Sequence, residues 1–231
     1  MTHQLIRLIP GSGRAGWHTG RMAALTIPWL PFPLVPAGRP PVTYEVRSAG
    51  LALTAAAGTD LFVDPAGAAE VPDAGRLVGN PPPGDFSLAA WVSVAFASKY
   101  DAGVLMLHAG ERRWAKLCFE LSPQVTPMAV TVVTRGTSDD CNSFEAQGNS
   151  LWLRMTRSGA AWAFHASVDG SWWRLLRYFA LGNEPADCVT QPESDVRVGF
   201  LAQSPTGKGC AVTFDQISFR PSAPADLRDG S

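Results

Sequence analysis

The sequence predicts an all-β protein, a two-sheet antiparallel sandwich of the jelly-roll type. From residue 43 onward, short apolar runs alternate with turn signals, and Asp169-Gly170 between two such runs is typical of a β-hairpin. Apolar and polar side chains alternate within the runs, whereas no segment shows the 3.6-residue period of an amphipathic helix. Roughly eleven strands at this spacing indicate two packed sheets. The expected strands are residues 51–55, 60–64, 86–97, 103–109, 113–121, 127–135, 151–157, 161–168, 172–179, 195–202 and 210–220.

Length and composition fit a single domain of this class. The chain has 231 residues, and all-β domains often reach this size undivided. Its 22 glycines and eight tryptophans suit a turn-rich sheet protein with aromatic surfaces. The net charge is −1 and the basic residues are scattered, whereas a nucleic-acid-binding protein shows a clustered basic face. We therefore expect no nucleic-acid partner.

The sequence carries no signal for a membrane or for secretion. No apolar run approaches the ~20 residues needed to span a bilayer, and residues 1–20 lack the apolar region of a secretory signal. The four cysteines show no CxxC spacing. We therefore expect reduced thiols in a cytoplasmic protein without membrane association. A disulfide between Cys141 and Cys188 would contradict this expectation.

Three segments are expected along the chain. Residues 1–21 are polar, rich in Gly and Arg and without periodicity, which predicts a disordered N-terminal extension. Residues 22–221 form the sandwich domain, and residues 222–231 form a short polar tail.

Alternation along the strand at 113–121 places Trp114, Lys116, Cys118 and Glu120 on one face. An ammonium, a carboxylate and an indole on one sheet face suit the recognition of a polyol. Cys118 is expected to be an inert, buried thiol.

Two further strands carry similar faces. In the strand at 86–97, Ser87, Ala89 and Trp91 share a face, and these small residues around one Trp are typical of a groove floor. In the strand at 151–157, Trp152 and Arg154 point the same way. Trp162 and Trp173 lie on apolar faces and are expected in the core.

Several short motifs follow one another along about residues 45–220. They are Gly58-Thr59-Asp60, Tyr100-Asp101-Ala102-Gly103, Trp114-x-Lys116 with Glu120, Val132-Val133-Thr134, Ser138-Asp139, Arg154, Asp169-Gly170 with Trp173 and Arg177, Gly199, Ser204-Pro205 and Gly209. In this order they resemble the concanavalin A-like family often labelled regulation-of-enolase or domain of unknown function. The resemblance implies a concanavalin A-like sandwich whose concave sheet holds a saccharide, and it implies no established reaction. Asp140 stands where an aromatic residue is frequent in that family, so contacts of that aromatic are not carried over.

We expect the candidate ligand-binding residues to converge on one groove of the concave sheet. Indoles would stack on sugar rings, and charged side chains would contact hydroxyl groups. Arg177 is included because of the resemblance alone, and if buried it would need Glu120 or Asp101 as a partner. The candidates are Trp91, Trp114, Lys116, Thr134, Asp139, Trp152, Arg154, His165 and Arg177.

The predicted function is therefore that of a carbohydrate- or polyol-binding module, and two alternatives stay open. One is an enzyme acting on a sugar-like substrate, with Glu120 as acid/base and Asp101 or Asp139 as its partner carboxylate. Against it, the sequence lacks the Glu-x-Asp-x-x-Glu strand motif common in sandwich glucanases. The other alternative is a protein-interaction domain. The sequence does not indicate the oligomeric state.

Four oxygen-bearing side chains, Asp101, Asp139, Asp140 and Asn142, are of a type that binds Ca²⁺. Their spacing is not that of an EF-hand loop, and such clusters usually satisfy turn backbone. We therefore expect no cofactor, with Ca²⁺ as the alternative.

Overall fold

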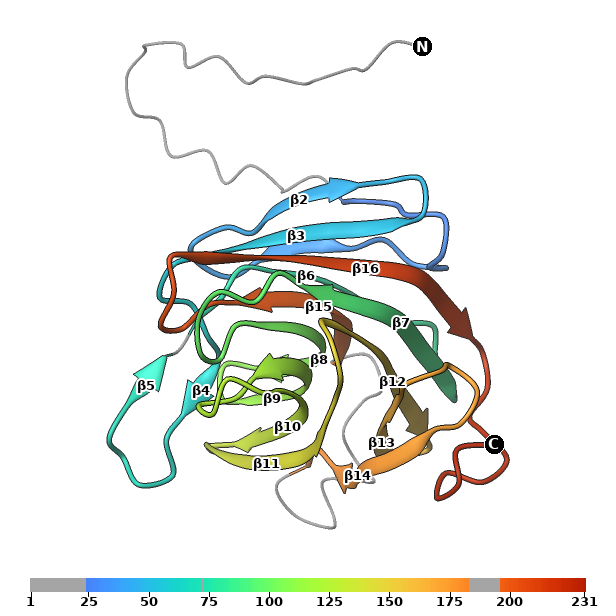
Figure 1. Ribbon diagram of the computed structural model, residues 1–231. Helices are drawn as coiled ribbons and strands as arrows, with labels where there is room; N and C mark the ends of the chain where they lie inside the picture. The colour runs from blue at the N-terminus through green and yellow to red at the C-terminus, as the bar shows by residue number, and fades with distance from the viewer. Residues whose placement is uncertain (1–23, 72, 183–195) are drawn as a thin grey trace, which may run out of the picture.

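The computed structural model describes residues 24–71, 73–182 and 196–231 (Figure 1). All regular elements in these ranges are β-strands. None of the described elements is a helix with the length and apolarity required to cross a membrane. The predicted N-terminal extension, residues 1–21, lies outside the described residues.

One seven-stranded antiparallel sheet, called here the β9 sheet, holds the long central strands of the chain. Its β8, β9 and β10 follow one another along the chain and pair as neighbours through short connections. In spatial order the strands are β1 (Val35–Ala37), β6 (Arg76–Gly79), β15 (Arg197–Gln203), β8 (Ala102–Gly110), β9 (Arg113–Leu121), β10 (Pro127–Arg135) and β11 (Thr137–Glu145).

The second seven-stranded antiparallel sheet, called here the β12 sheet, packs against the first. Together the two layers form an antiparallel sandwich of the jelly-roll type, which confirms the predicted fold class (Figure 1). In spatial order its strands are β14 (Arg174–Ala180), β13 (Ala161–Ser167), β12 (Ser150–Ser158), β7 (Phe86–Val94), β16 (Gly209–Arg220), β3 (Gly50–Ala56) and β2 (Thr43–Val46).

The core lies between the two sheets and follows the predicted alternation. Each fully buried Leu or Phe there stabilises the fold by roughly 1.5–3 kcal/mol. Trp162 lies in this core, as predicted. From the β9 sheet the core receives Leu105, Leu107, Leu117, Phe119, Val133 and Phe200, and from the β12 sheet Phe86, Leu88, Val92, Leu153, Met155, Phe164 and Phe214.

A second apolar cluster lies on the outer face of the β9 sheet. A hairpin of β4 (Phe62–Val63) and β5 (Glu70–Val71) covers part of this face, and Leu61 and Val63 pack there against Trp114 and Cys118. The β4–β5 hairpin is tied down by Val63 N, which donates a 3.0 Å hydrogen bond to Ser138 Oγ. The sandwich is therefore partly three layers deep at this point.

The strands that the sequence did not predict are short or polar. β1, β2, β5 and β6 have two to four residues each, which is too short for a period to be read. β11 is a full-length edge strand whose Thr, Asp, Asn and Ser residues indicated a loop. Since its outer edge has no neighbouring strand, polar residues are tolerated there.

Candidate functional site

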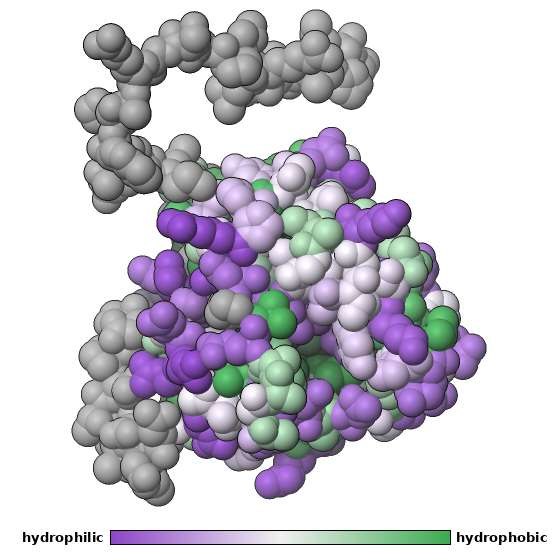
Figure 2. Space-filling view, turned by 90° about the vertical axis from the view of Figure 1, so that its left-hand side faces the viewer, coloured by the Kyte–Doolittle hydropathy of each residue, from purple (hydrophilic) through white to green (hydrophobic). Residues whose placement is uncertain are grey.

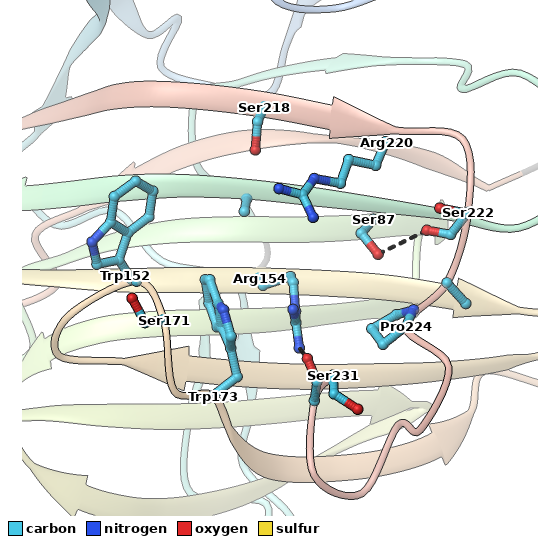
Figure 3. Close-up of a pocket in the computed structure, with 14 residues that line it drawn as sticks. Ser87, Trp152, Arg154, Ser171, Trp173, Ser218, Arg220, Ser222, Pro224 and Ser231 are labelled. Carbon is cyan, nitrogen blue, oxygen red and sulfur yellow. Dashed lines mark hydrogen bonds between the residues drawn. The ribbon is translucent and has the colours of Figure 1, made fainter.

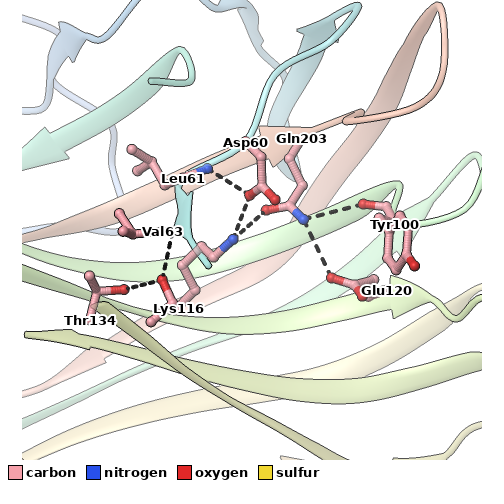
Figure 4. A network of polar contacts seen from close by, with 9 residues as sticks. Asp60, Leu61, Val63, Tyr100, Lys116, Glu120, Thr134 and Gln203 are labelled. Atoms are coloured by element: carbon pink, nitrogen blue, oxygen red, sulfur yellow. Dashed lines mark hydrogen bonds and ion pairs between the residues drawn. The ribbon is translucent and has the colours of Figure 1, made fainter. Parts of the chain in front are cut away.

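Lys116 is the centre of a polar network on the outer face of the β9 sheet. It projects from β9 with 1% of its surface exposed. Its Nζ lies 2.6 Å from Asp60 Oδ1 and donates a 3.0 Å hydrogen bond to Gln203 Oε1. Gln203 Nε2 in turn lies 3.4 Å from Glu120 Oε2, so four side chains form one chain of contacts (Figure 4).

The pairing of the strands and one loop bring the four side chains of this network to the same face of the β9 sheet. Lys116 and Glu120 are four residues apart on β9 and so face the same side of the sheet. Gln203 comes from β15, which is separated from β9 by β8. Asp60 arrives from the loop between β3 and β4 and receives a 2.6 Å hydrogen bond from Leu61 N.

The electrostatics of the network set Glu120 apart. Burial raises the pKa of Glu120 to about 8; Lys116 opposes this shift, while Asp60 and Asp140 add to it. Burial alone would lower the pKa of Lys116, but Asp60, Cys118 and Glu120 outweigh it and raise the pKa. At neutral pH the network therefore holds a charged lysine beside a protonated, half-buried carboxyl group.

Asp140 is a further acid on this face. The pairs Lys116–Val132 and Val132–Asp140 put it in the same row of the sheet as Lys116. The residue is exposed, but its carboxyl group is partly desolvated, and this raises the pKa of Asp140 above its usual value. Figure 2 views the molecule from the side on which the β4–β5 hairpin lies and shows hydrophobic residues in a hollow among mainly hydrophilic ones.

Two predicted contacts on this face do not hold. Trp114 is 1% exposed and packed in the second apolar cluster, so its ring presents no face to a ligand. Thr134 is fully buried, and its Oγ1 lies 2.9 Å from Ser138 Oγ. Both side chains lie under the β4–β5 hairpin, which alternation within the strands did not reveal.

Asp101 is wrongly predicted as a partner carboxylate of Glu120. Because Ala102 pairs with Glu120, the preceding Asp101 points to the other side of the sheet. Its buried carboxylate accepts hydrogen bonds from Ala97 N, Ser98 N and Ser204 Oγ at 3.0, 2.8 and 2.7 Å. Asp101 thus fixes the turn before β8.

Asp139 and Arg177 also differ from the prediction. Asp139 pairs with Val133, a core residue, so it points away from the Lys116 face. Its Oδ2 forms a 2.6 Å ion pair with Arg177 Nη2, joining the edge strands β11 and β14. The expected partner of Arg177, Glu120 or Asp101, is therefore wrong, and Asp140 rather than Asp139 lies in the row of Lys116.

The remaining candidates lie on the outer face of the β12 sheet. Trp91 and Trp152 are paired neighbours whose ring centroids are 5.6 Å apart. Arg154 contacts the ring of Trp173, with 4.3 Å between its Cζ and the ring centroid, and borders a pocket (Figure 3). Trp173 therefore lines a pocket, and its prediction as a core residue is wrong.

His165 lies beside Arg154 on the same face, beneath the C-terminal tail. It is fully buried, and its Nε2 is 2.8 Å from Leu227 O. Burial, with a smaller contribution from the charge of Arg154, lowers the pKa of His165 to about 4, although the contact with Leu227 O opposes the shift. A neutral imidazole held under the tail is structural, so the prediction that it faces an open groove does not hold.

The predicted convergence on a single groove is wrong. Lys116 and Glu120 lie on the outer face of one sheet, and Trp91, Trp152 and Arg154 on the outer face of the other, with the core between them. Alternation correctly placed Lys116 with Glu120, and Trp152 with Arg154, on shared outward faces. It could not give the sheet to which each strand belongs, because that depends on long-range pairing.

Two residues of the network were missed as site residues. Asp60 appeared only as a family landmark, and Gln203 was not singled out. Their spacing from Lys116, 56 and 87 residues, gives no local signal. The resemblance that pointed to Gly58-Thr59-Asp60 was the one available indication.

No metal site is evident in the part of the chain that the structure describes. There, no three His, Cys, Asp or Glu side chains are grouped so as to hold an ion. Cys118, Cys141 and Cys210 are free thiols, and burial raises the pKa of Cys118 well above its usual value. Cys188 lies outside the described residues.

The chain thus forms a jelly-roll β-sandwich with a lysine-centred polar network on one outer face. The chain belongs to the family described as "Protein of unknown function (DUF1349)", whose model matches residues 38–222. None of the curated proteins matches the sequence.

Solved structures share the fold. A functionally unknown protein from Saccharomyces cerevisiae is 22% identical with a TM-score of 0.66, and the match covers 81% of this chain and 95% of that one. A xyloglucan PUL GH43B protein of Bacteroides ovatus is 14% identical with a TM-score of 0.62, over 82% of this chain and 36% of that one. An alginate lyase from Klebsiella pneumoniae is 10% identical with a TM-score of 0.52, over 77% and 83%. This chain thus spans about a third of the Bacteroides ovatus protein.

Proposed function

We propose that this protein binds a carbohydrate or another polyol on the outer face of the β9 sheet, next to Glu120. The observation that carries the proposal is the continuous chain Asp60–Lys116–Gln203–Glu120 beside the second apolar cluster. A buried Lys–Asp pair is costly to desolvate and weak evidence for stability, so a role in recognition accounts for it better.

The chemistry of the network matches a polyol. Glu120 at the half-buried end offers a donor and an acceptor while protonated, and the exposed Asp140 adds further carboxyl oxygens as acceptors. Hydroxyl groups of a sugar both donate and accept, and the apolar neighbours suit its C–H surfaces. The carbohydrate-related names of the GH43B protein and the alginate lyase support this class of ligand at the level of the fold.

The second candidate function is catalysis with Glu120 as a general acid. A carboxyl group with a pKa of about 8 is protonated at neutral pH, as a general acid must be. Glycoside hydrolysis needs a second carboxylate, and Asp60 and Asp140 are the acids whose charges act on Glu120. Asp60 is already paired with Lys116, so this candidate depends on Asp140.

The narrower assignment to the regulation-of-enolase group is also a proposal. It is supported by the ordered landmarks, of which Tyr100-Asp101-Ala102-Gly103 and Trp114-x-Lys116 are examples. This assignment adds no reaction to either candidate function.

Isothermal titration with xyloglucan and alginate oligosaccharides, and with free xylose and glucose, tests the binding proposal. The exchange Glu120→Ala should weaken binding about tenfold or more, because the donor and the acceptor of this side chain are both lost. The matched control is Glu111→Ala, at an exposed turn residue between β8 and β9. Equal affinities of wild type and Glu120→Ala for every sugar bound would contradict the site.

Incubation of the same oligosaccharides with the protein, followed by chromatography of the products, tests the catalytic candidate. Products that form with wild type and not with Glu120→Gln would favour catalysis. Binding without products would favour the binding module.

A further inference from the structure

A pocket of about 390 Å³ lies on the outer face of the β12 sheet, separated by the core from the Lys116 network. Its floor is formed by Ser87 and Ala89 of β7. In the register of the sheet, Ala89 is flanked by Arg154 and Ser218, and Ser87 is flanked by Arg220. Small side chains on a central strand between longer ones leave a hollow, and its volume is in the range of small-molecule sites.

The lining of this pocket is cationic. Arg154 and Arg220 approach it from the strands on either side of β7 (Figure 3). No Asp or Glu side chain is among the residues that line it. Burial and, to a smaller extent, the charge of Arg220 lower the pKa of Arg154 to about 10. Two guanidinium groups thus share one hollow without a side-chain anion between them.

Both arginines have unused hydrogen-bond donors. Arg154 Nη2 donates a 2.8 Å hydrogen bond to Gly230 O, whereas its buried Nε has no partner among the described residues. Arg220 is exposed and forms no ion pair within the described parts of the chain. A guanidinium carries five N–H donors, so most of this capacity is free for a ligand.

The walls hold Arg154 in place. Its guanidinium stacks on Trp173, which packs edge-on against Trp152 at 6.3 Å between centroids. On the other side of Arg154, the C-terminal tail packs closely against it at Gly230. A Cβ on Gly230, whose φ is +80°, would lie 2.7 Å from Trp173 Cβ and 2.8 Å from Arg154 Nη2. A charged group that is already oriented loses little entropy on binding.

We propose that this pocket binds a small organic anion, namely an acidic sugar or a sugar phosphate. Its carboxylate or phosphate group lies between the guanidinium groups of Arg154 and Arg220. Planar guanidinium groups match the geometry of both anions and bind them through paired hydrogen bonds. Serine hydroxyls around the pocket contact the hydroxyl groups of the ligand; they belong to Ser171, Ser218 and Ser222. This site is independent of the one proposed on the β9 sheet.

Isothermal titration of the full chain at low ionic strength tests this proposal with glucuronate, glucose 6-phosphate, inorganic phosphate and glucose. We expect at least one of the two anionic sugars to bind to this pocket. Glucose, which has no charged group, should not bind there. The exchange Arg220→Gln should weaken that binding about 10- to 100-fold, because a charge-assisted contact is lost. Whichever of glucuronate and glucose 6-phosphate binds with the higher affinity shows whether the pocket prefers a carboxylate or a phosphate group.

Matched variants separate the pocket from other sites. Arg135→Gln removes an exposed arginine at the end of β10, on the other sheet, and should leave the affinity unchanged within about twofold. Glu120→Ala, which disables the polyol site, serves as the background for a repeat of these titrations. Arg220→Gln should weaken binding of the anionic sugar by the same factor in that background, so the outcome at the polyol site does not affect this result. Arg154→Lys should weaken binding while keeping the charge; if that variant fails to fold, the exposed Arg220 still provides the test.

Several results would overturn the proposal. The proposal fails if neither anionic sugar binds at millimolar concentration. It also fails if Arg220→Gln binds the anionic sugar as tightly as wild type does. Inorganic phosphate that binds as tightly as glucose 6-phosphate would contradict the role given to the serine hydroxyls.

Discussion

Replacement of Lys116 by Met tests the polar network most directly. The exchange removes an ammonium that is 1% exposed and pairs with Asp60 at 2.6 Å, while keeping a side chain of similar length. Asp60, whose side chain is 13% exposed, then loses its counter-charge and keeps the hydrogen bond from Leu61 N. Removing one partner of a buried ion pair costs about 3–5 kcal/mol. For a chain of this size that corresponds to a loss of roughly 6–20 °C in Tm.

Urea and thermal unfolding followed by circular dichroism measure this effect, with Lys208→Met as the control because Lys208 is exposed. A double-mutant cycle with Asp60→Asn then isolates the pair. Because the neutral amide no longer needs a counter-charge, we expect the double variant to lose clearly less than the sum of the single losses. The reasoning is refuted if Lys116→Met lies within about 1 kcal/mol of wild type, or if the single losses add.

Three further predictions follow from the described contacts. The pKa of Glu120 is raised in the folded state from 4.5 to about 8, so its contribution to stability is complete below pH 4.5 and is lost as the pH rises toward 8. Between pH 6.5 and 8 the free energy of unfolding of Glu120→Gln should gain about 1–2 kcal/mol relative to wild type, as measured by urea unfolding; parallel curves would contradict this. Asp139→Asn should cost less than about 1 kcal/mol and the loss should shrink in 1 M NaCl, because the Arg177–Asp139 pair is partly exposed. Gly199→Ala should cost at least about 3 kcal/mol and yield mostly insoluble protein, since the added Cβ would lie 1.9 Å from Leu77 O; a soluble variant with an unchanged melting curve would contradict the close approach of β15 to β6.

The strand register explains which parts of the site were predictable. Lys116 and Glu120 share a face, and so do Trp152 and Arg154, because side chains alternate along any strand. The small face of β7 formed by Ser87 and Ala89 is the floor of a pocket, as its composition indicated. These features depend on neighbours a few residues away.

The edge strand β11 shows the limit of local patterns. Its sequence Thr-Ser-Asp-Asp-Cys-Asn-Ser indicates a turn, yet it pairs with β10 over most of its length. Pairing with a strong neighbour outweighs weak intrinsic propensity, because β propensity depends mainly on the surroundings. As a consequence, Asp140 rather than Asp139 faces Lys116.

Local sequence patterns predicted the fold class, most long strands and which residues share a face in the strands at 113–121 and 151–157, since these follow from the period of two and from turn residues. Tertiary structure alone decided that Lys116 meets Asp60 and Gln203, that Trp114 is covered, and that Arg154 lies in a separate pocket with Arg220. The physical reason is that a strand's partners are selected by burial and hydrogen bonding over the whole chain. No local window of sequence contains that information.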